Sequence, residues 1–207
     1  MKFLRQAPAA LLFATLLSPA LADEYQDAIS KAFPGFQILG SSEIKLDKDL
    51  DPKIYNKVKD RPGQIVGRFN SDQVMDFAAL IRGSRLIHIS EDKANRVRAD
   101  DYYEGYLAVC LGRAQGGYEC TKLETDPLHI HLPYDGFLEK FSPGIAGCTS
   151  LGKTFKAPKP RRPLSFEETE SNVDIRFNTD AIALFDSMYF IYLPQGRGMY
   201  RKCGAGS

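Results

Sequence analysis

Short runs of β-branched and aromatic residues, separated by polar turns, dominate the hydrophobic pattern of the chain. The clearest example is QIVGRFNSDQVMDFAALIR at Gln64–Arg82. This segment predicts a strand at Gln64–Phe69, a tight polar loop at Asn70–Gln73 and a second strand at Met75–Arg82. The pattern indicates a chain built mainly from strands.

Turn signals divide the following residues into hairpins. Gly83-Ser84 predicts a turn between Met75–Arg82 and a strand at Arg85–Ser90. A second hairpin is expected from Tyr103–Gly112 and Tyr118–Glu124. Successive hairpins favour an antiparallel meander.

Strand patterns return near the C-terminus. They predict strands at 173–177, 181–185, 188–193 and 199–203, the second of them central because it is almost wholly apolar. Between residues 127 and 163 proline and glycine become frequent, and an exposed Pro-rich, basic loop is expected at about 153–163.

Two segments have helical patterns. Asp23–Phe33 carries acidic residues in its first turn and apolar residues on one face, which predicts an N-terminal helix packed on a sheet. Asp51-Pro52 is typical of a helix start, and that helix should run to about Val58. The expected fold class is mainly β (α+β): an antiparallel β-meander or sandwich, or a partial propeller-like sheet, with one N-terminal helix and disulfides.

Residues 1–22 have the pattern of an export signal. Lys2 and Arg5 precede the apolar run Ala9–Leu17, and Ala20-Leu21-Ala22 is a small-x-small cleavage site. We expect cleavage after Ala22, a periplasmic or secreted protein, and one β-rich domain over residues 23–207. No second apolar run is long enough to predict a membrane span.

The charge of the mature chain is nearly balanced. Without Lys2 and Arg5, 25 basic side chains remain against 26 acidic ones. Binding to nucleic acid independently of sequence requires the neutralisation of many phosphates, so a nucleic-acid partner is not expected.

All four cysteines follow the signal: Cys110, Cys120, Cys148 and Cys203. An even number in an oxidising compartment predicts two disulfides, for which three connectivities exist. Cys110 and Cys120 should face each other across the second hairpin, which favours Cys110–Cys120 and leaves Cys148–Cys203.

The polar loop contains oxygen-bearing side chains at Asn70, Asp72 and Asp76. This spacing resembles the D-x-N-x-D-G-x-x-D calcium loop of bacterial FG-GAP/VCBS-type β modules. Arg68 stands where that family has its first Asp, and Gln73 stands where it has the turn Gly. Two alternatives follow: a degenerate Ca²⁺ loop, or a cation-free turn in which Arg68 pairs with Asp72 or Asp76.

Two motifs suggest other chemistry. Gly147–Thr154 satisfies the string of a phosphate-binding P-loop, but prolines flank it on both sides, so no nucleotide site is expected. His129-Ile130-His131 would place two imidazoles on one face of a strand, and with Asp126, Asp135 or His88 they would form a zinc site.

Three functions are therefore considered. The first is an exported non-enzymatic binding protein, because stand-alone FG-GAP-like proteins resemble periplasmic immunity proteins that neutralise toxic hydrolases, such as those delivered by type VI secretion. Aromatic and arginine side chains are enriched at such interfaces, which suggests contact residues at Tyr102, Tyr103, Tyr106, Arg161 and Arg162. The alternatives are a calcium-stabilised structural or adhesive module and a zinc hydrolase that uses His129 and His131.

Overall fold

The computed structural model describes residues 19–91, 99–124, 126–149, 172–186, 189–196 and 199–204. Residues 1–18, which form most of the expected export signal at 1–22, and the expected basic loop 153–163, with Arg161 and Arg162, lie outside these ranges. The predicted β-rich, antiparallel fold class is confirmed.

Two long neighbouring strands organise the first sheet. They are β3 (Asp76–Ile89) and β4 (Asp100–Gly112), and the sheet order is β1-β3-β4-β5, with β2 also paired to β3 and β6 to β4. The shorter strands are β1 (Phe36–Ile38), β2 (Gln64–Gly67), β5 (Tyr118–Lys122) and β6 (Leu128–Ile130).

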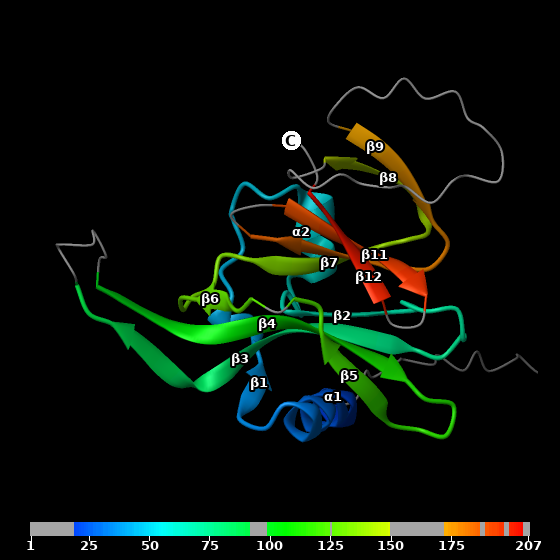
Figure 1. The fold of residues 1–207 in the computed structure, drawn as a ribbon. Coiled ribbons are helices and arrows are strands. Elements are labelled where there is room, and N and C mark those ends of the chain that lie inside the picture. The colour runs from blue at the N-terminus through cyan, green and yellow to red at the C-terminus, as the bar shows by residue number, and fades with distance from the viewer. Residues whose placement is uncertain are drawn as a thin grey trace, which may run out of the picture.

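The second sheet comes from the C-terminal half of the chain. Its order is β7-β10-β11-β12-β8-β9, all antiparallel, and it lies against one face of the first sheet (Figure 1). Its strands are β7 (Phe137–Phe141), β8 (Gly144–Thr149), β9 (Asn172–Phe177), β10 (Ala181–Phe185), β11 (Tyr189–Gly196) and β12 (Met199–Gly204). As predicted, the apolar strand β10 has a neighbour on both sides.

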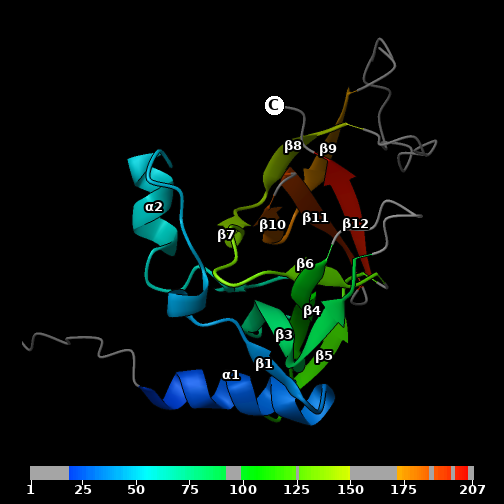
Figure 2. The same cartoon turned by 90° about the vertical axis from the view of Figure 1, so that its left-hand side faces the viewer.

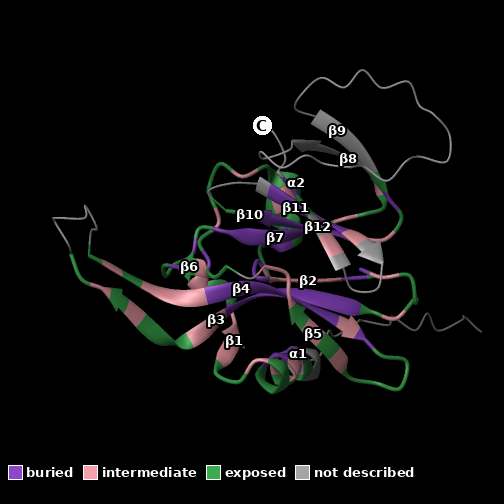
Figure 3. Cartoon of the chain, in the orientation of Figure 1, coloured by how far each residue is buried: buried purple, intermediate pink, exposed green. Residues whose placement is uncertain are grey.

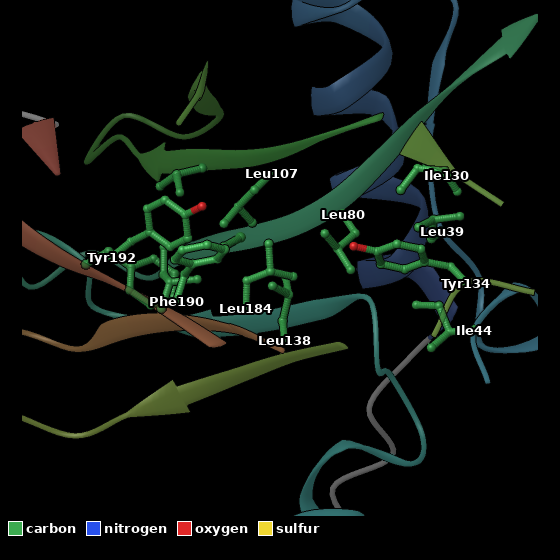
Figure 4. Close-up of a cluster of buried hydrophobic side chains, with 14 residues drawn as sticks. Leu39, Ile44, Leu80, Leu107, Ile130, Tyr134, Leu138, Leu184, Phe190 and Tyr192 are labelled. Carbon is green, nitrogen blue, oxygen red and sulfur yellow. The ribbon is translucent and has the colours of Figure 1, made fainter. Parts of the chain in front are cut away.

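The main hydrophobic core lies between the two sheets. Leu80 and Leu107 of the first sheet pack with Leu138 and Leu184 of the second, and all four are almost fully buried (Figure 4). Loop residues such as Tyr134 close one end of this core. The two sheets therefore depend on each other for the burial of their inner faces.

Helix α1 (Pro19–Ala32) covers the other face of the first sheet (Figure 2). Tyr25 and Ile29 are buried against it, and the Tyr25 ring lies 4.4 Å from the ring of Phe77. This agrees with the predicted amphipathic helix, although the helix begins four residues earlier than Asp23.

The remaining helical elements lie between β1 and β2. They are a 3-10 turn at Ser41–Glu43 and helix α2 (Pro52–Val58). The Asp51 carboxylate accepts a hydrogen bond of 2.7 Å from the backbone N–H of Lys53, so Asp51 caps α2 as the Asp-Pro pair predicted.

The predicted turn at Gly83-Ser84 is wrong. β3 continues through both residues, and its pairing with β4 shifts between Arg82↔Gly105 and Leu86↔Tyr103. Three residues of β3 therefore lie opposite one residue of β4, which is a β-bulge. A glycine can accompany either a turn or a β-bulge, and at Gly83 the structure has the bulge.

Candidate functional site

Beyond the bulge, β3 and β4 leave the core as a two-stranded ribbon. Its described pairs run from Leu86↔Tyr103 to Ile89↔Asp100. Figure 1 shows this ribbon extending away from both sheets, and Figure 3 shows that its residues are exposed or only half-buried. It carries Leu86, whose side chain is 47% exposed.

One face of the ribbon and the adjoining β6 forms an aromatic and imidazole surface, which we call the Tyr102 patch: Tyr102, His129, His131 and Asp100. The His129 ring stacks on Tyr102 with 3.9 Å between centroids. The His131 ring lies 6.2 Å from Tyr102, and its Nδ1 is 3.5 Å from a carboxylate oxygen of Asp100. Side-chain alternation explains the grouping, since Glu104 lies opposite His129 on the same face as Tyr102.

The third histidine of the chain lies on the opposite face of the same ribbon. His88 is directly across from Asp101, and its Nδ1 contacts the Asp101 carboxylate. Asp100 and Asp101 therefore point to opposite faces, as expected for neighbours on one strand, and each lies beside an imidazole.

The two predicted zinc ligands do lie on one face, but their contacts differ from those of a metal site. His129 stacks on a tyrosine, and His131 is within 3.1 Å of the Asp101 carbonyl oxygen. Over the ranges that the structure describes, no group of three or more His, Cys, Asp or Glu side chains is arranged to hold a metal ion.

The loop that resembles a calcium site is closed by its own hydrogen bonds. The two carboxylate oxygens of Asp76 accept from backbone N–H groups of Phe69 at 2.7 Å, Asn70 at 3.3 Å and Gly112 at 2.9 Å. The Asn70 side chain accepts from Asp72 N–H, and that of Asp72 accepts from Val74 N–H. These are Asx turns, which take the oxygens that a cation would need.

The predicted pairing of Arg68 with Asp72 or Asp76 is wrong. Arg68 is exposed, its backbone N–H donates to Asp180, and no ion pair joins its guanidinium to either carboxylate in the described ranges. Backbone N–H groups, and not the guanidinium, are the hydrogen-bond donors to Asp76. Burial raises the pKa of the Asp76 carboxyl, and the backbone hydrogen bonds offset part of that effect.

Gln73 adopts the conformation that its place in the loop demands. Its φ of 67° is left-handed, at the position where the calcium-loop family has glycine. One residue of the loop therefore has a left-handed backbone, and the loop oxygens accept backbone N–H groups.

The proposed contact tyrosines lie in different surroundings. Tyr102 is half-buried on the ribbon, and Tyr103 packs against the core between the sheets, with Arg82 over its ring at 4.5 Å. Tyr106 is only 8% exposed and lies under the cover of α1, so its assignment to a contact surface is wrong. The alternation of strand side chains sends Tyr102 and Tyr103 to opposite faces.

The chain is cross-linked as the hairpin geometry predicted. Cys110 lies opposite Cys120 in the pairing of β4 with β5, and the two sulfurs are bonded. Cys203 is disulfide-bonded too. Its neighbour Gly204 pairs with Thr149, beside Cys148, whose side chain lies outside the described part.

No protein-family model, curated protein or solved structure matches this chain. Among the described residues, no helix combines the length and apolar character needed to cross a membrane.

The surface also contains hollows that the sequence did not indicate. One, of about 550 Å³, lies between α2 and the segment before it and is lined by Tyr55 and Lys59. Another, of about 590 Å³, runs along β3 at Gly83–His88 beside Phe36. A third, of about 560 Å³, lies between the Asn70 loop and Lys140 of β7.

Proposed function

We propose that this chain is an exported, non-enzymatic binding protein that inhibits another protein, in the manner of an immunity protein that blocks a toxic hydrolase acting in the periplasm. The observation that carries this proposal is the Tyr102 patch on a ribbon that projects from the core. A projecting ribbon reaches into a concave partner surface, and a half-buried tyrosine such as Tyr102 supplies contact area at a low cost in conformational entropy.

The surrounding chemistry supports contact with a protein. Tyr102 and His129 offer flat apolar faces, while His131 and Asp100 beside them provide hydrogen-bonding groups at the edge of the same surface. An aromatic centre bordered by polar groups is the usual composition of a protein interface.

Export is part of the proposal. The pattern at residues 1–22 and the disulfide-bonded cysteines both fit an oxidising compartment outside the cytoplasm. No second candidate function is put forward, because the Asn70 loop uses its oxygens internally and the histidines contact Tyr102 and Asp101.

Affinity capture tests the proposal. The tagged chain is exported in its native host, and retained proteins are identified by mass spectrometry. We expect one exported hydrolase to be enriched by the unaltered chain and lost with Tyr102→Ala. Tyr55→Ala is the matched control, because Tyr55 is 42% exposed on α2 and outside the patch. Equal capture by both variants, or no retained protein, would contradict the proposal.

A further inference from the structure

The outer edge of the ribbon strand β3 carries hydrogen-bonding groups without a described neighbour. β1 pairs with β3 only as far as Gly83, and the N–H of Ser84 donates to Gly35 at 2.9 Å. Beyond that point no described strand lies on this side of β3. The hollow of about 590 Å³ runs along the same residues.

The direction of the free groups follows from alternation. Leu80 and Ser84 both direct backbone groups toward the β1 side. In an antiparallel sheet, every second residue directs its N–H and C=O to the same neighbour. Within β3, Leu86 and His88 therefore direct theirs to the open edge.

The side chains along this edge are symmetric in character about His88. Ile87 and Ile89 lie one residue on either side, and Arg85 and Glu91 lie three residues on either side. Arg85 and Glu91 are both exposed, and within the described ranges neither has an ion-pair partner. Ile87 lies directly opposite Tyr102 and Ile89 lies two residues further along the strand, so both isoleucines share the face of the ribbon that carries Tyr102.

We propose that this edge binds a second copy of the chain by antiparallel strand pairing centred on His88. His88 then lies opposite His88 of the second copy, and each Ile87 lies opposite Ile89 of the other. Each Arg85 lies opposite Glu91 of the other copy, so two ion pairs flank the apolar pairs. The outward N–H and C=O groups of Leu86 and His88, with those of Ser90 when the strand extends by one residue in the dimer, complete the ladder between the two copies.

The charges along the edge of β3 favour a second copy of the same chain as the partner. Charged side chains on an edge strand normally prevent pairing with another strand. Here the two charges are opposite in sign and equidistant from the centre, so one antiparallel register with an identical strand satisfies both. A shift by one residue removes both Arg85–Glu91 pairs and no longer places Ile87 opposite Ile89 of the other copy.

The dimer goes beyond the proposed function and uses a different part of the ribbon. Partner binding is assigned to the face with Tyr102, whereas self-association uses the edge of β3. In the dimer the two ribbons form one continuous sheet, and two Tyr102 patches lie on the same face. A short ribbon buries little area, so we expect a weak dimer with a dissociation constant on the order of micromolar.

Charge reversal tests the register. Sedimentation velocity over a concentration series should show a monomer–dimer equilibrium for the unaltered chain. Arg85→Glu and Glu91→Arg should each raise the dissociation constant at least about tenfold, because each places like charges opposite one another. The double variant Arg85→Glu/Glu91→Arg should restore the dimer. Lys53→Glu, an exposed change on α2, is the control and should leave the equilibrium unchanged.

Disulfide trapping tests the centre independently of affinity. His88→Cys places two thiols opposite one another at the centre, and mild oxidation should give covalent dimers. Leu86→Cys lies on the same face of the strand but away from the centre and should give few. Circular dichroism establishes that each variant is folded. Equal trapping at both positions, no trapping, or a double charge variant that stays monomeric would overturn the proposal.

Discussion

At the scale of single residues, Asp76 determines the conformation of the Asn70 loop. Its side chain is 1% exposed, and its two oxygens accept backbone hydrogen bonds from both the loop and the end of β4. One carboxylate thus joins two segments of the first sheet. This carboxylate therefore stabilises the loop through backbone hydrogen bonds.

Asp76→Asn should therefore destabilise the protein. The amide has one acceptor oxygen, and its NH₂ group must face a backbone N–H that is now without an acceptor. We expect a loss of about 1–3 kcal/mol in the free energy of unfolding, measured by urea denaturation. Asp72→Asn is the matched control, because Asp72 is exposed, and it should change stability by less than about 0.5 kcal/mol. Equal losses in the two variants would show that the Asp76 carboxylate has no special role.

Several tyrosines should make the fold sensitive to alkali. A hydrogen bond to Glu104 together with burial raises the pKa of Tyr106 to about 12, and burial raises that of Tyr118 to about 12. Burial also raises the pKa values of Tyr134, Tyr192 and Tyr200.

The sign of the pH effect follows from the unfolded chain, in which a tyrosine ionises near 10. Below that pH both states are protonated and the fold keeps its full stability. As the pH rises from about 10 to about 12, the unfolded state releases protons that the folded state retains, so the free energy of unfolding falls. Urea denaturation at increasing pH measures this fall, and Tyr106→Phe should make it smaller. A stability independent of pH across this range would contradict these shifts.

At the scale of secondary structure, the sequence was most informative where the pattern was local. The Asp-Pro cap of α2 and the alternating apolar residues of β10 depend on adjacent side chains. Strands β7 and β8 were not predicted because they lie in the segment rich in Pro and Gly, where the local pattern is weak. Their existence depends on pairing with β10 and β9, which no local pattern contains.

In the candidate site, too, some features follow from the local sequence pattern and others depend on the pairing of distant strands. The common face of His129 and His131 follows from strand alternation alone. Their stacking with Tyr102 needs the pairing of β6 with β4, which joins residues distant in the chain. The ribbon leaves the core at the β-bulge that follows Arg82. The sequence Gly83-Ser84 is compatible with a turn as well as with this bulge, so it does not predict where the ribbon begins.

The docking of β6 depends on a glycine. A Cβ at Gly105 would lie 2.3 Å from Cγ1 of the buried Ile130, so only glycine allows β6 to approach β4 there. We expect Gly105→Ala to displace β6 and His129, and to lower both stability and partner capture. Chemical-shift changes in a ¹H–¹³C spectrum at His129 measure the displacement. Unchanged His129 signals in this variant would contradict the close packing of β6 on β4 at Gly105.

At the scale of the whole molecule, one core between two sheets predicts cooperative unfolding. Leu138 of β7 is fully buried against residues of the first sheet. Leu138→Ala should lower the free energy of unfolding by about 2–5 kcal/mol, with coincident transitions in far- and near-ultraviolet circular dichroism. Met75→Ala, at a side chain that is 47% exposed, should have little effect. Separate transitions for the two sheets would contradict a shared core.

The whole molecule also presents its proposed functional surfaces at one end. The ribbon carries the Tyr102 patch on one face, and along its side it carries the edge of β3, which has no partner strand among the described residues. Both surfaces are held away from the core by strands whose other ends are buried within it. A rigid base with an exposed end suits a protein that acts by contact.

Titration of the captured hydrolase with the purified chain tests this account most directly. We expect its activity to fall in proportion to added chain and to vanish at equimolar amounts, while Tyr102→Ala leaves it active. An undiminished activity at excess chain, or turnover of a substrate by the chain alone, would contradict a protein that inhibits by surface contact.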